Sequence, residues 1–328
     1  MKALKSIALL LFVLVGLLYA VAFWYLRNPS MGIGSSVQIK HRADASRLKT
    51  HVEFLSGIVP NRSYQNADSM FRAERYISDY LTSLGYKVSL QEVYEDKTVY
   101  HNVIVRLGAE TGPLVVIGAH YDVAEEDNPG ADDNASGVAG LLELARLLKE
   151  NEPELKSPVE LVAYTLEEPP YFATFGMGSV YHADQIKERG EEVKLMLSLE
   201  MIGYYSDEWF SQKFPIPLLY ALYPWRGNFI SLVASPSERK EVRMVKDSFS
   251  SIEGLKTYSI NAPTILPGID YSDHRSYWEH EWPAIMVSDT AFYRNLEYHK
   301  PGDTAGRLDF EKMKLVVEAL YTTVVNVP

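Results

Sequence analysis

Three predicted strands of this sequence end in histidine or carboxylate side chains. His120 and Asp122 follow the apolar run "LVVIGA", Glu167 and Glu168 follow "LVAYTL", and Glu200 follows "LMLSL". Taken singly, each residue has an ordinary explanation as a capping or solvated group. In an open α/β sheet, however, the carboxyl ends of neighbouring strands meet in one crevice. Three such strand ends together therefore favour a shared site.

The chemistry of these side chains is that of a metal site. The chain has no cysteine, so a metal would be held by imidazole and carboxylate groups alone. This ligand set suits catalytic zinc, or manganese and cobalt, better than a structural zinc cluster. A bridging carboxylate flanked by two sets of histidine plus carboxylate would hold two ions roughly 3.5–4 Å apart. The bridge would come from "GADDN", at Asp132 or Asp133, where small residues let the backbone approach closely.

The second set needs another histidine. His274 in "GIDYSDHRSYW" and His299 in "NLEYHKPGDT" are the candidates, because both lie in loops late in the chain. Asp122 lies on the same strand face as His120 and is placed to orient the second nitrogen of that ring. The remaining histidines are interpreted as structural or exposed: His41, His51, His101, His182 and His280.

The elements that must position these residues alternate between strand and helix. "PLVVIGAHYD", "PVELVAYTLEE" and "VKLMLSLEMIG" are apolar strands, separated by amphipathic helices such as "ASGVAGLLELARLLKE". This order predicts an α/β fold of three layers (α/β/α), with a mixed, mainly parallel sheet and helices on both faces. No internal repeat or change of composition divides the chain, so residues 43–328 are predicted to form one domain.

The N-terminus is predicted to be a membrane anchor. "SIALLLFVLVGLLYAVAFWYL" carries no charge and has about the ~20 residues that a transmembrane helix needs. We therefore expect a signal anchor over residues 1–27, followed by a linker over residues 28–42. Lys2 and Lys5 predict a cytoplasmic N-terminus, with the domain in the periplasm or outside the cell. A cleaved signal peptide is the alternative, since "AVA" at Ala20 to Ala22 offers small residues, and the domain would then be secreted.

Composition narrows the choice of partners. The 47% of hydrophobic residues predict a substantial packed core. The net charge of −11 and the absence of a basic run argue against a nucleic-acid partner. Membrane contact is expected through the N-terminal helix, and no obligate protein partner is indicated.

At its strand ends and late loops the sequence resembles the co-catalytic zinc aminopeptidases of metallopeptidase family 28. The relatives of these enzymes include bacterial leucyl aminopeptidases, glutamate carboxypeptidase II and glutaminyl cyclases. The resemblance runs from about His101 to Asp309 through six blocks in order: "GAHYD", "PGADDNASG", "EEPPYFATFGMGS", "SLEMIG", "SDHRSYW" and "EYHKPGDT". It implies a zinc-exopeptidase-like fold, two Zn²⁺ ions per chain and a peptide substrate.

The resemblance also implies a role for each site residue. His120 and Glu200 would bind one ion, Glu168 and His299 the other, and Asp132 would bridge them. Glu167 would be the general base, moving a proton from a metal-bridging water to the leaving amine, and Asp122 would brace His120. The role of Asp133 stays open. Residues that would line or brace the substrate pocket are Tyr298, His274, Asp273 and Phe172.

Two departures from the family pattern bear on specificity. Glu200 stands where many members have Asp, which moves the ligating oxygen by one methylene. The loop "PPYFATFG", where many members have a turn rich in Gly and Leu, suggests an aromatic-lined pocket.

The predicted function is hydrolysis of N-terminal residues from peptides by an exported, membrane-anchored exopeptidase. One alternative is a glutaminyl cyclase with a single zinc, or another amidohydrolase on the same scaffold. The other is an inactive binding or receptor ectodomain, which is disfavoured because every ligand position and the base are filled.

Overall fold

An eight-stranded mixed sheet forms the centre of the computed structural model, which describes residues 2–30, 37–95, 97–124 and 127–327. Its strand order is β1-β2-β4-β3-β5-β8-β6-β7. The strands are β1 Val88–Glu95, β2 Thr98–Gly108, β3 Leu114–His120, β4 Pro158–Tyr164, β5 Val193–Glu200, β6 Ile230–Ala234, β7 Thr257–Asn261 and β8 Ala284–Ser288. The neighbours β4, β3, β5 and β8 all run parallel, so their carboxyl ends lie at one edge of the sheet.

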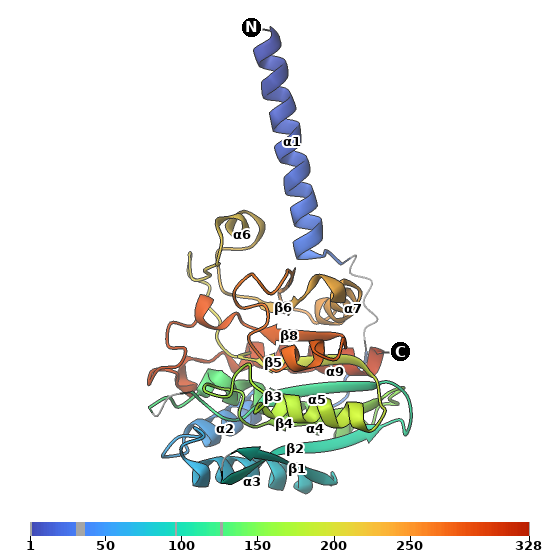
Figure 1. The fold of residues 1–328 in the computed structure, drawn as a ribbon, viewed down its shortest axis with the longest axis vertical. Coiled ribbons are helices and arrows are strands. Elements are labelled where there is room, and N and C mark those ends of the chain that lie inside the picture. The colour runs from blue at the N-terminus through green and yellow to red at the C-terminus, as the bar shows by residue number, and fades with distance from the viewer. Residues whose placement is uncertain (1, 31–36, 96, 125–126, 328) are drawn as a thin grey trace.

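Antiparallel pairs complete the sheet on both sides of this parallel centre. β2 pairs antiparallel with β4 and with β1, while β6 pairs antiparallel with β8 and parallel with β7. Figure 1 shows β1, β2, β4, β3, β5, β8 and β6 following one another across the molecule in this order, with β1 farthest from α1.

Helices pack against both faces of the sheet. They are α2 Ala45–Ser56, α3 Ala67–Ser83, α4 Gly137–Asn151, α5 Gly178–Glu188, α7 Arg239–Ser250, α8 His274–Trp278 and α9 Phe310–Asn326. The short helix α6 Pro217–Leu222 packs instead with the end of α1. Alternate residues of β3 supply the two sides: Val115 and Ile117 join the core that includes α4 and α9, and Leu114 and Val116 join the core that includes α5 and α8. This arrangement confirms the predicted three-layer α/β/α architecture.

The N-terminal helix α1 runs from Lys2 to Arg27 and projects from the domain near α6 and α7 (Figure 1). Within the described residues, its segment Lys5–Arg27 is long and apolar enough to cross a membrane by length and composition. The predicted linker over residues 28–42 falls partly on residues 31–36, which lie outside the described residues. The first residue of the predicted linker, Asn28, packs against the domain. It is buried and donates a 2.6 Å hydrogen bond to the Arg239 carbonyl.

Candidate metal centre

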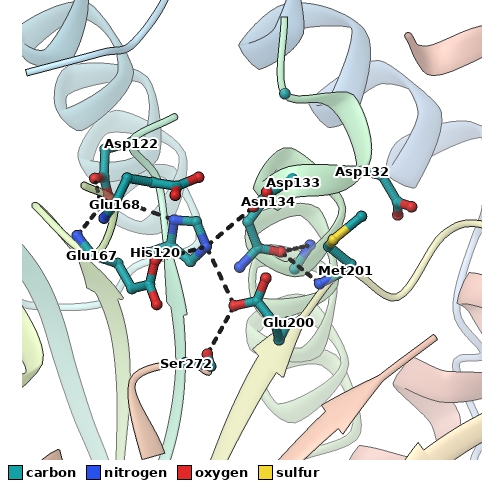
Figure 2. A network of polar contacts seen from close by, with 12 residues as sticks. His120, Asp122, Asp132, Asp133, Asn134, Glu167, Glu168, Glu200, Met201 and Ser272 are labelled. Atoms are coloured by element: carbon teal, nitrogen blue, oxygen red, sulfur yellow. Dashed lines mark hydrogen bonds and ion pairs between the residues drawn. The ribbon is translucent and has the colours of Figure 1, made fainter. Parts of the chain in front are cut away.

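The carboxyl ends of the four parallel strands bring the predicted site residues together (Figure 2). His120 is the last residue of β3 and Glu200 is the last residue of β5. Glu167 and Glu168 follow β4, and His299 lies in the loop after β8. The polar residues sit here because a continuous apolar run ends at this edge, where the buried strands give way to loops.

One aspartate, Asp133, lies between the two histidines. Its Oδ1 is 3.4 Å from Nε2 of His120, and its Oδ2 is 3.1 Å from Nε2 of His299. Each histidine also faces a glutamate: His120 Nε2 is 3.3 Å from Glu200 Oε2, and His299 Nε2 is 3.2 Å from Glu168 Oε2. Glu167 lies at the margin, with Oε2 3.9 Å from His120 Nε2. The cluster therefore has two histidine-plus-glutamate sets with one carboxylate between them.

Asp132 points away from this cluster, and its predicted role as the bridging ligand is wrong. Its Oδ1 accepts the Gly203 N–H at 3.0 Å, and its Oδ2 accepts the Asn295 side-chain amide at 3.1 Å. The cause is local, because the turn Ala131–Ser136 is interrupted by a non-helical backbone at Asp133 (φ −102°, ψ 91°). The two consecutive carboxylates therefore face opposite sides (Figure 2).

His274 also lies outside the cluster. It is buried, donates a 2.8 Å hydrogen bond to the Ile269 carbonyl, and packs edge-on against Trp278. Of the two late histidines, His299 is thus the one that faces the carboxylates.

Asp122 holds the two glutamates through their backbone. Its Oδ1 and Oδ2 accept the N–H groups of Glu167 and Glu168 at 3.1 and 3.0 Å. The same Oδ1 lies 3.5 Å from Nδ1 of His120. One buried carboxylate therefore orients the end of β3 and the loop after β4 together, as groups around a metal ligand commonly do.

Two further residues, Asp303 and Arg62, position the backbone of the candidate metal centre. Asp303 accepts the N–H groups of Asp132 and Asp133 at 3.1 and 3.0 Å, which fixes the "ADD" segment to the loop of His299. Asp303 lies in the block "EYHKPGDT" beside His299, so the sequence did contain a signal for this residue. Arg62, only 1% exposed, donates to the carbonyls of Tyr121 and Gly130 at 2.8 and 2.9 Å. No local pattern marks Arg62, because its contacts are made only in the folded chain.

Burial of so many carboxylates shifts their titration. Burial raises the pKa of Glu167 and of Glu200, and burial together with the nearby Asp133 raises the pKa of Glu168 to about 7. Burial alone would lower the pKa of His299, but the facing carboxylates of Asp133 and Glu168 raise it to about 10. The cluster thus attracts positive charge.

The donor atoms themselves fit a metal-binding role. His120 Nε2, Asp133 Oδ1, Glu168 Oε1 and His299 Nε2 are buried and make no hydrogen bond to the described residues. Buried polar atoms normally have a hydrogen-bond partner, so a group of buried atoms without one indicates that a ligand such as a metal ion binds there. Donor atoms of His120, Asp133 and Glu168 all lie within 4.8 Å of one another. Ligands about 2.0–2.2 Å from a tetrahedral zinc ion would be roughly 3.3 Å apart, as the closest donor pairs here are.

An apolar pocket opens beside Glu200. Its walls include Phe214, Leu219, Met286 and Phe292, and Tyr298 also lines it. The Tyr298 ring is stacked on His299, with centroids 3.7 Å apart. The other predicted pocket residues, Phe172, Asp273 and His274, do not line this pocket. Phe172 packs against Tyr271, and Tyr271 lines the pocket.

Comparison with known proteins agrees with this geometry. Residues 102–324 match the model of peptidase family M28. The chain is 47% identical over 291 residues to the uncharacterized protein YfbL of Escherichia coli (strain K12), covering 87% of this chain and 88% of that protein. It is 25% identical over 316 residues to leucine aminopeptidase 1 of Sclerotinia sclerotiorum, covering 87% of this chain and 76% of that protein.

A solved structure extends the comparison to the fold. The glutaminyl cyclase of Bacteroides thetaiotaomicron, bound to N-acetylhistamine, matches with a TM-score of 0.64 and 18% identity, over 88% of this chain and 99% of that one. At this identity the likeness concerns the fold alone. The family model, in contrast, spans more than half of the sequence. The matched residues include all five donor residues of the candidate metal centre. The chain therefore belongs to peptidase family M28, a family of zinc-dependent metallopeptidases.

Proposed function

We propose that the chain is an aminopeptidase that binds two zinc ions and is held at the outer face of a membrane by α1. The observation that carries the proposal is the position of Asp133, whose two oxygens face two different histidines. A carboxylate in that position serves two cations better than one.

The proposed ligand sets follow from the pairing of donors. His120 and Glu200 would hold one ion, His299 and Glu168 would hold the other, and Asp133 would bridge them. Ser272 donates a 2.8 Å hydrogen bond to Glu200 Oε2, which steadies that glutamate although it is longer than the aspartate of many family members.

Glu167 is the proposed general base. Two bound zinc ions would activate a water molecule and polarise the scissile carbonyl. Glu167 stands beside the ligand cluster without being one of the close donors, and its backbone is fixed by Asp122. Its carboxylate would take the proton of the attacking water and deliver it to the leaving amine.

The substrate we propose is a peptide with a free N-terminus and an apolar or aromatic first residue. The pocket beside Glu200 presents apolar walls from Phe214, Met286 and Phe292 to such a side chain. The adjoining carboxylates favour a positively charged amino group over a carboxylate. Leucine aminopeptidase 1 of Sclerotinia sclerotiorum, among the relatives, supports the same direction.

The proposal for α1 is that it stays attached and crosses the membrane. Its apolar segment meets the length that spanning requires, Lys5 is the first residue of that segment, and Lys2 precedes it. By the positive-inside rule the N-terminus would then be cytoplasmic and the catalytic domain extracytoplasmic.

The test is a comparison of Glu167→Gln with the wild-type chain, using aminoacyl arylamides with a free or an acetylated amino group. We expect the wild type to cleave only free amines, and Glu167→Gln to retain its zinc while kcat falls by roughly 10²–10⁴-fold. Glu188→Gln, at an exposed glutamate in α5, is the matched control and should be unaffected.

Other outcomes separate the alternatives. Normal hydrolysis by Glu167→Gln would contradict the assigned base. One tightly held zinc per chain, together with cyclisation of N-terminal glutamine, would favour a glutaminyl cyclase. No turnover of any peptide by a fully zinc-loaded chain would favour a binding domain.

A further inference from the structure

A group of large apolar side chains is exposed beside the end of α1. It belongs to residues 209–226, which we name the α6 loop. The exposed fractions are 63% for Trp209, 56% for Phe210, 38% for Ile216, 45% for Leu218 and 40% for Trp225. Trp209, Phe210 and Trp225 form a connected surface, because the ring of Phe210 lies 6.4 Å from that of Trp209 and 5.1 Å from that of Trp225. A connected apolar surface of this kind indicates a contact with a partner or a membrane.

A hydrogen bond fixes the position of the α6 loop along the axis of α1. The hydroxyl of Tyr19 donates a 3.2 Å hydrogen bond to the carbonyl of Ala221 in α6. Tyr19 precedes Arg27, the end of the apolar segment, by eight residues, which is about 12 Å along a helix axis. Figure 1 shows α6 beside the domain-proximal part of α1. A bilayer crossed by α1 would therefore reach the level of α6.

The contact between α1 and the domain fixes this height. Leu219, Leu222 and Tyr223 pack with Phe23 and Leu26 of α1 in one apolar cluster. Arg27 donates to the Leu222 carbonyl at 3.1 Å and lies over the ring of Tyr223.

A buried lysine, Lys246, also contributes to the contact between α1 and the domain. The Lys246 ammonium donates to the carbonyls of Arg27 and Asn28 at 2.8 and 3.3 Å. These contacts hold α1 and the domain together in one orientation.

The α6 loop itself carries positive charge, from Lys213 and Arg226, although Asp207 and Glu208 directly precede it. The net charge is −11, yet no Asp or Glu occurs from Trp209 to Ser237. Arg226 lies over the ring of Trp209 at 4.3 Å, and Arg239 lies over the ring of Tyr25 at 4.9 Å. Tryptophan and tyrosine prefer the interfacial layer of a bilayer, and basic side chains are attracted to anionic headgroups.

We propose that the α6 loop is a second membrane-binding surface, seated in the interfacial layer of the leaflet from which α1 emerges. The inference rests on the proposed membrane anchor and adds to it a fixed orientation of the catalytic domain on the bilayer. In that orientation Leu219, on the inner side of α6, walls the pocket beside Glu200, while the neighbouring Leu218 faces lipid.

The absence of cysteine makes the test direct. Single cysteines at Ile216, Leu218 and Trp209 in the full chain would carry a nitroxide spin label in vesicles of phosphatidylcholine and phosphatidylglycerol. Phe175→Cys is the matched control, since Phe175 is 86% exposed and lies beside residues of β1, the sheet edge farthest from α1. Accessibility to oxygen relative to a nickel chelate is expected to be several-fold higher at 216 and 218 than at 175.

The outcomes distinguish this inference from the anchor. A chain that floats with the vesicles and resists alkaline extraction, but whose labels at 216 and 218 are as accessible to nickel as the label at 175, would overturn the α6 contact alone. A chain that does not stay with the vesicles would overturn both. Peptide hydrolysis by the labelled chains checks their folding. If the cysteine variants do not fold, quenching of Trp209 and Trp225 by brominated lipid in a Trp24→Phe chain gives the same readout.

Discussion

Two consecutive aspartates have different tasks at the candidate metal centre. Asp133 faces the imidazoles of His120 and His299. Asp132 instead joins Gly203, just after β5, to Asn295, just before the His299 loop. A carboxylate that only connects loops can lose its charge and still accept hydrogen bonds, whereas a bridging ligand needs both charged oxygens.

Substitution of each aspartate by asparagine separates these tasks. We expect Asp133→Asn to lose at least one zinc per chain and to lower kcat/KM by roughly 100-fold or more, because one bridging oxygen becomes an amide nitrogen. Asp132→Asn should keep both ions, because the Asp132 carboxylate faces Gly203 and Asn295 and not the two histidines. Metal analysis after dialysis, alongside arylamide hydrolysis, checks the pair. Loss of zinc from Asp132→Asn with full zinc in Asp133→Asn would reverse the assignment.

The site could be predicted from sequence to the level of residue type and strand end. His120, Glu168 and Glu200 follow apolar strands, and the topology of a parallel sheet brings such ends together. The choice between Asp132 and Asp133 depends on the non-helical backbone at Asp133 and Asn134 inside a short turn, which residue types do not encode. Arg62 was missed for a related reason, because its partners are carbonyls brought close only by folding.

At the scale of elements, the long periodic segments were predictable, whereas three of the short elements were not. The strands β3, β4 and β5 and the helix α4 match their apolar patterns. The elements α6, α8 and β7 have six, five and five residues, too few for a helical or alternating pattern to stand out. α6 is nevertheless the element that borders both the pocket and α1, so the missed element matters most for the proposed membrane contact.

The start of α4 is packed directly against the end of β5, and this contact carries a prediction. A Cβ on Gly137 would meet the Leu199 carbonyl at 2.6 Å, as well as the side chain of Asn134. A Cβ on Gly140 would come close to the end of the Ile202 side chain, at 2.7 Å, and would meet no backbone atom among its three nearest neighbours. We expect Gly137→Ala to lower the free energy of unfolding by about 1–3 kcal/mol, because backbone cannot yield as a side chain can.

Gly140→Ala is the matched control. It should change the free energy of unfolding by less than about 1 kcal/mol, because the higher helix propensity of alanine offsets a small side-chain shift. Denaturant unfolding of both variants tests the difference, and equal effects would show that the approach of α4 to β5 is not restrictive.

At the scale of the whole molecule, the candidate centre joins parts of the chain that are far apart in sequence. Its donors come from the ends of β3 and β5, the loops after β4 and β8, and the turn before α4. Without bound cations, the buried carboxylates of Asp133, Glu168 and Glu200 would repel one another across the edge of the sheet. Zinc binding and the stability of the domain should therefore be coupled.

Removal of the metal tests that coupling. Ions that bind only the folded chain stabilise it by about 4 kcal/mol when present at ~1,000 times Kd. For a domain of this size that corresponds to a fall in Tm on the order of 10 °C after dialysis against 1,10-phenanthroline. Adding zinc should restore Tm, and Asp133→Asn should show a smaller shift because it has already lost an ion. An untagged wild-type chain whose Tm is the same with and without the chelator would contradict a metal centre at these strand ends.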